Sequence, residues 1–306
     1  MDRLGGVLGF PPGGLLVKRD DLTGLAGGGN KARKLELLCA EALADGCDTL
    51  VTGGGKQSNH VRMTAAAARA LGLACTVVLA ADEPDLPTGN VVLDELFGPE
   101  IVWAGDLDYG PLEERITAEA HRLAAEGRRP YSIPVGGAST LGATAYALAV
   151  DELIEQIGAV DLVVVADGSG GTHAGLAAGF GDHTKVLGVD VGTRPNLDDA
   201  VPRMAIDVAQ QLGRTAPTGT LCLDVERFGA GYGEPTDSCL EALTMTARLE
   251  GIVLDPVYGG KAMAGLVAGV REGRIDAARE RVVFLHTGGM PALFSSRYSS
   301  WIHSVI

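Results

Sequence analysis

Three glycine-rich segments each follow directly after a short apolar segment of the chain. GGGK follows DTLVT at 48–52, DGSGGTHAG overlaps the end of DLVVVAD at 161–167, and TGGMPAL follows RVVFLH at 281–286. The apolar segments have the length and the β-branched composition of buried strands. Ligands of parallel α/β folds bind at the carboxyl ends of the strands, so the three segments predict one shared site.

Strands alternate with helical segments over the 306 residues of the chain. Further strands are predicted at 74–80, 100–103, 186–191 and, bounded by prolines at an edge, 130–134. Helices are predicted at 59–71, 111–126 and 141–157. This alternation predicts an α/β fold in which parallel sheets are flanked by helices. The length suits two lobes that share a cleft.

Charge and cysteine content narrow the possible partners. The chain has 25 basic and 39 acidic residues, for a formal charge of −14. So acidic a chain is a poor candidate for binding nucleic acid or an anionic membrane. Its five cysteines contain no C-x-x-C pair, so we expect neither a disulfide framework nor a metal site. No apolar run approaches about 20 residues, and no signal peptide is evident, so a cytoplasmic location is expected.

The segment 167–175, DGSGGTHAG, has the composition of an anion-binding loop. Backbone N–H groups at a helix start, joined by serine and threonine hydroxyls, suit a phosphate. The Walker A pattern is absent, and His173 breaks the G-x-G-x-x-G pattern, so the loop carries no nucleotide signature. A tight strand-to-helix turn without a ligand is the alternative.

The segment 27–36, GGGNKARKLE, places two of the six lysines of the chain together. Lys31 would lie in the first turn of a helix, where the helix dipole and a second cation such as Lys34 lower a lysine pKa. A lysine so shifted is a better nucleophile and Schiff-base former. Two solvated helix lysines are the alternative.

The segment 53–60, GGGKQSNH, offers polar side chains at a predicted helix start. Ser58 can hold a carboxylate or take part in proton transfer. N-capping by Ser58 or Asn59 is the structural alternative. Adjacent residues on one helical turn do not face each other, so a Ser-His-Asp triad is not expected.

Seven motifs in order through residues 15–294 resemble one family. They are GGGNKARKLE, GGGKQSNHVRMTAAAA, RRPYSIPVGGASTLGA, GSGGTHAGLAAG, GYGEPTDSCLEAL, LDPVYGGKAMAGL and FLHTGGMPALF. They look like the D-cysteine desulfhydrase and 1-aminocyclopropane-1-carboxylate (ACC) deaminase family of fold type II, tryptophan-synthase-β-like pyridoxal-phosphate enzymes. The resemblance implies a homodimer with the cofactor in an interdomain cleft. We expect residues 1–45 plus 146–306 to form the large cofactor-binding domain and residues 46–145 the small substrate-side domain.

The resemblance also implies residue roles. Lys31 would hold pyridoxal 5'-phosphate as a Schiff base, and Lys34 would lie near the phosphate. The remaining cofactor contacts would be Ser169, Gly170, Gly171 and Thr172 at the phosphate, Asn59 at the phenolic oxygen and Thr287 at the pyridine nitrogen. The substrate side would be lined by Gln57, Ser58 and His60, with Tyr232 and Tyr258 facing the substrate.

Two positions separate the subfamilies. Deaminases of this family resemble one another in a Glu where this chain has Gly259 and a Leu before the last Gly pair, where this chain has Thr287. The threonine agrees with the desulfhydrase pattern, so we expect β-elimination from a small amino acid. D-cysteine would give pyruvate, ammonia and sulfide.

Other departures keep alternatives open. Lys56 stands where the family usually has an apolar residue, and it would pair with a sulfonate if it faced the cleft. An L-cysteate sulfo-lyase or another deaminase of β-substituted amino acids is therefore the first alternative, and ACC deaminase is the next. The tail FSSRYSSWIHSVI does not resemble the usual ending, in which a tyrosine follows PALF shortly. A non-catalytic pyridoxal-phosphate-binding protein is the alternative of a different class.

Overall fold

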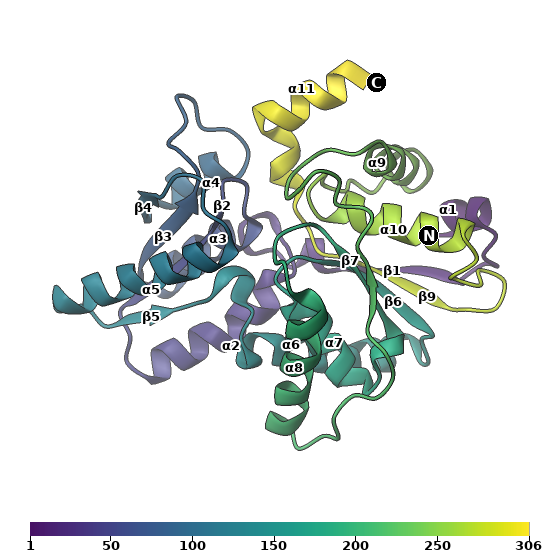
Figure 1. Ribbon diagram of the computed structural model, residues 1–306, viewed down its shortest axis with the longest axis horizontal. Coiled ribbons are helices and arrows are strands. Elements are labelled where there is room, and N and C mark those ends of the chain that lie inside the picture. The colour runs from purple at the N-terminus through teal and green to yellow at the C-terminus, as the bar shows by residue number, and fades with distance from the viewer. Residues whose placement is uncertain (306) are drawn as a thin grey trace.

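The computed structural model describes residues 1–305, which form two sheets with every strand parallel to its neighbours (Figure 1). The larger sheet has the order β1-β9-β6-β7-β8, with β1 at Leu15–Arg19, β9 at Val282–His286, β6 at Leu162–Asp167, β7 at Val186–Asp190 and β8 at Cys222–Asp224. The smaller sheet has the order β4-β3-β2-β5, with β4 at Glu100–Trp103, β3 at Ala74–Ala80, β2 at Thr49–Gly55 and β5 at Pro130–Ser132.

Helices cover both faces of each sheet. They are α1 (Asp2–Leu8), α2 (Lys31–Ala44), α3 (Asn59–Leu71), α4 (Asn90–Phe97), α5 (Tyr109–Ala125), α6 (Thr140–Ile157), α7 (Gly171–Phe180), α8 (Leu197–Gln211), α9 (Asp237–Glu250), α10 (Gly259–Arg271) and α11 (Ser296–Val305). In Figure 1, α1, α9 and α10 lie on one side of the larger sheet, while α6, α7 and α8 lie on the other. Helix α2 packs against both α6 and α3, so it joins the two lobes.

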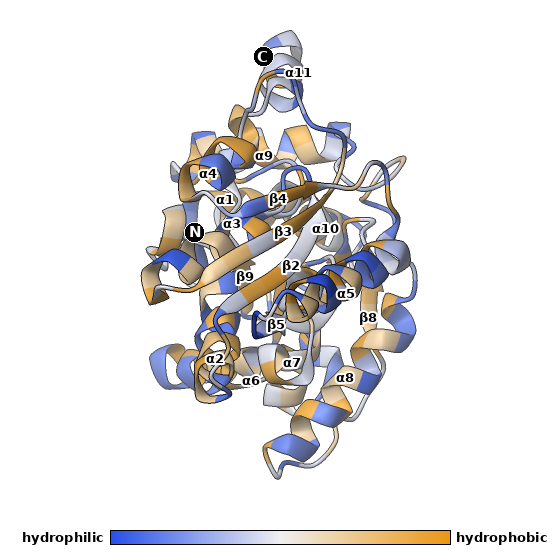
Figure 2. Cartoon of the chain, turned by 90° about the vertical axis from the view of Figure 1, so that its left-hand side faces the viewer, coloured by the Kyte–Doolittle hydropathy of each residue, from blue (hydrophilic) through white to orange (hydrophobic). Residues whose placement is uncertain are grey.

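The strands form where the sequence is β-branched and apolar, because such side chains pack well on both faces of a covered parallel sheet. Five of the six residues of β6 are buried, as are all of β9. Figure 2 shows β3 coloured mainly as hydrophobic, with hydrophilic residues on α5 nearby. Val51 and Val78 of the small sheet pack there against Ile116 of α5. Alternating apolar strands and amphipathic helices thus bury a core on each side of each sheet.

One expectation about the glycine segment after β2 was wrong. The strand predicted at 48–52 was expected to end before the glycines, but β2 continues through Gly55 and pairs in register with β3 as far as Ala80. The polar segment Ser58–His60 therefore starts only after two turn residues, at the first turn of α3. Strands β1 and β8 were not predicted. β8 has only three residues at a sheet edge, so its pattern is too short to recognise.

Within residues 1–305, none of the helices combines the length and the apolar character needed to cross a membrane. The strands of both sheets end toward the cleft between the lobes, where the glycine-rich segments lie. The predicted convergence of those segments on one site is therefore confirmed by the residues that line the cleft.

Candidate active site

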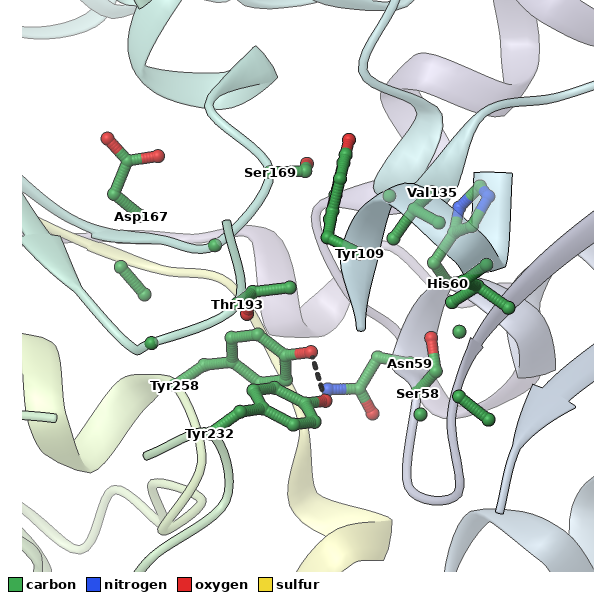
Figure 3. Close-up of a pocket in the computed structure, with 18 of the residues that line it drawn as sticks. Ser58, Asn59, His60, Tyr109, Val135, Asp167, Ser169, Thr193, Tyr232 and Tyr258 are labelled. Atoms are coloured by element: carbon green, nitrogen blue, oxygen red, sulfur yellow. Dashed lines mark hydrogen bonds between the residues drawn. The ribbon is translucent and has the colours of Figure 1, made fainter. Parts of the chain in front are cut away.

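A cleft of about 1240 Å³, counting the part open to solvent, is lined by residues from both lobes. It brings together ten of the residues singled out in the sequence: Lys31, Ser58, Asn59, His60, Ser169, Gly170, Thr172, Tyr232, Tyr258 and Thr287. Figure 3 shows the two tyrosines on one side of the pocket, facing Ser58 and Asn59 on the other.

Lys31 begins α2, as expected, and its Nζ donates a hydrogen bond of 2.9 Å to Oδ1 of Asn30. Burial lowers the pKa of Lys31 to about 8, the positive charge of Arg62 adds to this effect, and Asp255 opposes it. The lowered pKa agrees with the expectation, but its cause differs. Burial also holds the pKa of Lys34 well below its usual value, so the cation that acts on Lys31 is Arg62.

The segment Asp167–Thr172 forms a cradle at the start of α7. Gly170 is the N-cap of α7 in a left-handed conformation, and no side chain caps the first turn. Ser169 lies so close to Gly136 that a Cβ on Gly136 would stand 2.4 Å from the Ser169 Oγ. Thr172 Oγ1 accepts a 3.1 Å hydrogen bond from Asn30 Nδ2, which leaves its own proton to donate. Free N–H groups and two hydroxyls make this cradle suitable for a phosphate.

Lys34 lies behind this cradle and does not line the pocket. Its side chain is 1% exposed, and its Nζ donates a 3.1 Å hydrogen bond to the carbonyl of Gly136. A Cβ on Gly171 would stand 2.9 Å from the same Nζ. Lys34 therefore braces the loop from the protein side.

Two segments that line the pocket were not singled out from the sequence. Asp106–Tyr109, at the end of the loop from β4 and the first residue of α5, lies at the mouth, and Gly192 and Thr193 follow β7. The guanidinium of Arg194 stacks over the Tyr109 ring at 5.2 Å from the ring centre. The pKa of Tyr109 is raised to about 12, mainly by burial and in addition by the negative charge of Glu113. No local sequence pattern marks these residues, because the two segments meet only after the lobes have packed together.

Ser58 and His60 are held in defined orientations. Ser58 is the N-cap of α3, and its Oγ accepts a 3.3 Å hydrogen bond from the Val61 amide. The capping role that the sequence allowed is therefore confirmed. Thr52 donates to the carbonyl of Ile133, so its hydroxyl accepts the 2.9 Å bond from His60 Nε2. Burial keeps the pKa of His60 well below its usual value, so the ring is neutral.

Gln57 and Lys56 do not line the pocket. The Gln57 side chain instead donates to the carbonyl of Thr88 at 2.9 Å and accepts from the Asn90 amide at 2.8 Å. These bonds point it toward the start of α4 and away from the expected substrate side. Lys56 is half-buried in the turn before α3.

Two buried charged groups hold the tyrosine pair in place. Asp255 is fully buried and accepts hydrogen bonds of 2.8 to 2.9 Å from the amides of Val257, Tyr258 and Gly259. Lys261, also fully buried, donates to the carbonyl of Phe228 at 2.8 Å, in the loop that leads to Tyr232. Both tyrosine hydroxyls have raised pKa values because they are buried, so they stay protonated at neutral pH.

The C-terminal segment contributes a third tyrosine. Tyr298, in α11, is 4% exposed and donates a 2.7 Å hydrogen bond to the carbonyl of Gly233. It packs with Val257 against Tyr232 and Tyr258. The sequence of the tail differs from the usual ending, but the tail does place a tyrosine against the site.

Comparisons with known proteins agree with this geometry. The model of the family described as pyridoxal-phosphate dependent enzyme matches residues 1–288. A solved structure described as an ACC deaminase homologue is 36% identical, covers 99% of this chain and 91% of its own, and superposes with a TM-score of 0.90. The processed form of threonine deaminase isoform 2 from Solanum lycopersicum is 17% identical over 98% of this chain and 80% of its own, with a TM-score of 0.66.

A third solved structure, a pyridoxal 5'-phosphate-dependent aspartate racemase, is 16% identical over 94% of this chain and 87% of its own, with a TM-score of 0.63. At such identities the threonine deaminase and the racemase show the fold alone. The residues of the cleft fit the cofactor of this family, because the cradle suits its phosphate and the amine of Lys31 suits its aldehyde. The resemblance, the fold class and the cofactor expected from the sequence are thereby confirmed: the chain belongs to the pyridoxal-phosphate-dependent enzymes of fold type II, and its cofactor is pyridoxal 5'-phosphate.

Proposed function

We propose that this enzyme is a lyase that eliminates the β-substituent of a small, uncharged amino acid, with D-cysteine as the first candidate. The observation that carries the proposal is that the amine of Lys31 and the hydroxyls of Tyr232 and Tyr258 line the same pocket. β-Elimination needs a base for the α-proton and an acid for the leaving group. The pocket offers both.

Each residue then has a proposed role. Lys31 binds the cofactor covalently, and Asn59 donates to its phenolic oxygen. Ser169, Gly170, Gly171 and Thr172 hold the phosphate, Lys34 braces that loop, and Thr287 meets the ring nitrogen. The hydroxyl of Thr287 brings no charge to the nitrogen, unlike a carboxylate. Ser58 accepts from the Val61 amide, so its proton is free to bind the substrate carboxylate.

The bound cofactor supplies an electron sink for the charge left at Cα when its proton is removed. The amine of Lys31, freed when the substrate amine takes its place, removes that proton; this requires its neutral form, and a pKa of about 8 makes this form available near neutral pH. Tyr258 or Tyr232 donates a proton to the departing sulfide, because both hydroxyls are protonated at neutral pH. Hydrolysis of the remaining product gives pyruvate and ammonia.

The charges of the lining favour an uncharged β-substituent over a sulfonate. In the described part of the chain, Lys31 is the only lysine or arginine that lines the cleft, whereas Asp106 and Asp108 are exposed at its mouth. Lys56, which would bind a sulfonate, does not line it. L-cysteate would therefore meet the carboxylates of Asp106 and Asp108 at the mouth, and among the described residues the lining offers its sulfonate no lysine or arginine besides Lys31.

ACC deamination is the second candidate function, because the 36% identical structure is described as an ACC deaminase homologue. Gly259 and Thr287 argue against ACC deamination, because the deaminases of this family resemble one another in having Glu and Leu at these two positions. A non-catalytic cofactor-binding protein is the alternative of another class. The presence of a base and a pair of hydroxyls in one pocket favours catalysis.

We also propose that residues 1–45 plus 146–306 form the large domain and residues 46–145 the small one. The four strands of the smaller sheet all fall in 46–145, and the five strands of the larger sheet fall outside it. Helix α2 packs on both lobes, so it marks the boundary. A homodimer and a cytoplasmic location remain predictions.

A panel of substrates tests the proposed reaction. The cofactor-loaded protein would be given D-cysteine, L-cysteine, L-cysteate and ACC separately, while ammonia, pyruvate and sulfide are measured. We expect all three products with D-cysteine, in equal amounts, and little turnover of L-cysteate. Ammonia from ACC without pyruvate from D-cysteine would replace the proposal by the deaminase. No product from any substrate would favour the non-catalytic alternative.

A further inference from the structure

Arg62 is among the largest side chains that are completely buried in this protein, at 0% exposure. It lies on α3, one turn after Asn59, and no counter-ion contacts it directly among the described residues. Burying an arginine is costly unless its N–H groups are satisfied. A buried arginine beside a cofactor site therefore calls for a structural reason.

The hydrogen bonds of Arg62 reach two segments of the site. Its Nη1 donates to Oδ1 of Asn59 at 3.0 Å and to Oδ1 of Asn90 at 2.8 Å. Its Nη2 donates to the carbonyl of Gly28 at 2.8 Å, in the loop that leads to Lys31. One planar guanidinium thus ties α3 of the small lobe to the lysine loop of the large lobe.

Asn90 completes the arrangement around Asn59. Its Nδ2 donates to Oδ1 of Asn59 at 3.0 Å and to the carbonyl of Gln57 at 2.8 Å. The Asn59 oxygen therefore accepts from two donors, which fixes the orientation of the amide. Its Nδ2 is left to face the pocket, and Figure 3 shows this nitrogen pointing toward the tyrosine pair.

We propose that Arg62 and Asn90 are positioning residues that present the Asn59 amide N–H to the cofactor. Arg62 also holds the loop at Gly28, so that the amine of Lys31 lies in the correct position relative to the cofactor. This inference rests on the proposed placement of the cofactor between Lys31 and Asn59. It assigns a function to Gln57 as well, since that side chain holds the backbone amide of Asn90.

The charges around the site are consistent with this role. Asp94 of α4 raises the pKa of Arg62, but burial dominates and lowers it to about 10, so the guanidinium stays cationic at neutral pH. The positive charge of Arg62 also adds to the effect of burial in lowering the pKa of Lys31. The other ionisable groups that act on or respond to Lys31 are Lys34, His60 and Asp255.

The test separates positioning from charge. Full-length Arg62→Lys, Arg62→Gln and Asn90→Ala proteins would be compared with wild type and with Arg69→Gln, which removes a cation from the exposed end of the same helix. The readouts are the dissociation constant for pyridoxal phosphate, from titration of the visible absorbance, and the visible circular dichroism of the bound cofactor. Neither needs a substrate.

We expect Arg62→Lys, Arg62→Gln and Asn90→Ala each to raise the dissociation constant about tenfold or more and to weaken the dichroism, because each loses hydrogen bonds that orient Asn59. Arg69→Gln should match wild type. If Arg62→Gln does not fold, Arg62→Lys and Asn90→Ala carry the test. Wild-type behaviour of both Arg62→Lys and Asn90→Ala would overturn the inference. If the wild-type protein has no lyase activity but the dissociation constants of wild type and variants follow the expected order, the proposed reaction is wrong and this inference still holds.

Discussion

The hydroxyl oxygens of Tyr232 and Tyr258 lie 2.7 Å apart, and their rings meet edge to face at an angle of 63°. The two residues come from distant segments of the chain, one after β8 and the other at the start of α10. A hydrogen bond of this length lets one hydroxyl donate to the other while the second proton points into the pocket. The pair therefore acts as one proton-donating unit.

Replacing either tyrosine by phenylalanine removes a hydroxyl and keeps the ring. We expect Tyr232→Phe and Tyr258→Phe each to lower kcat for D-cysteine by about 100-fold or more, with the visible absorbance of the cofactor unchanged. In the double variant, kcat should fall by a much smaller factor than the product of the two single-variant factors, because the hydroxyls share one hydrogen bond. Strictly multiplicative losses would show that the hydroxyls act separately.

Tyr298 supports this pair from α11. Tyr298→Phe loses the bond to the Gly233 carbonyl, so we expect the free energy of unfolding to fall by about 1 kcal/mol and kcat to fall severalfold. Tyr131→Phe is the matched control, since Tyr131 contacts only the surface residue Glu41 through its hydroxyl. Chemical denaturation and steady-state kinetics measure the two effects. Equal kcat values for both variants would mean that the tail does not support the site.

Asp94 makes the stability depend on pH. It is fully buried, neither carboxylate oxygen has a hydrogen-bond partner, and burial raises its pKa to about 7. The unfolded chain loses this proton near pH 4. Between these values the folded state holds a proton that the unfolded state lacks, so this group lowers stability as pH rises from 4 to 7.

Asp94→Asn removes that titration. Between pH 5 and pH 8 we expect the variant to gain about 2–3 kcal/mol of unfolding free energy relative to wild type. Urea denaturation at the two pH values measures this difference. A gap between the proteins that stays constant with pH would show that Asp94 ionises normally in the folded state.

Lys56 provides a negative prediction. Since its side chain does not line the cleft, Lys56→Met should leave turnover of D-cysteine and L-cysteate within about twofold of wild type. The comparison needs only kcat/KM for the two substrates. Selective loss of L-cysteate turnover would show that Lys56 reaches the substrate after all and would revive the sulfo-lyase alternative.

The sequence predicted those features that depend on local patterns. The strands at 74–80 and 100–103 and the helix at 59–71 have the expected bounds. Lys31 begins its helix, and β5 lies at a sheet edge as its flanking prolines suggested. The glycine-rich segments meet because parallel strands deliver their carboxyl ends to one edge. The bounds of the elements need only neighbouring residues, whereas the meeting of the glycine-rich segments also needs the rule for parallel sheets.

The remaining features depend on contacts between distant segments. Gln57 and Ser58 are neighbours, yet one side chain contacts Thr88 and the other lines the pocket. That difference is set where the start of α4 packs against the turn. No local pattern singles out Arg62 within its alanine-rich helix, and only the fold shows it buried. The contact of Tyr298 could not be predicted from the sequence either, because its hydrogen-bond partner lies 65 residues earlier.

The central claim is that Lys31, and not Lys34, carries the cofactor. The protein would be saturated with pyridoxal phosphate, reduced with borohydride to make the link permanent, digested, and examined by mass spectrometry. We expect a phosphopyridoxyl group on Lys31, an absorbance at ~410–420 nm before reduction, and loss of both in Lys31→Ala. A label on Lys34, or a Lys31→Ala protein that keeps the absorbance and turns over D-cysteine, would contradict it.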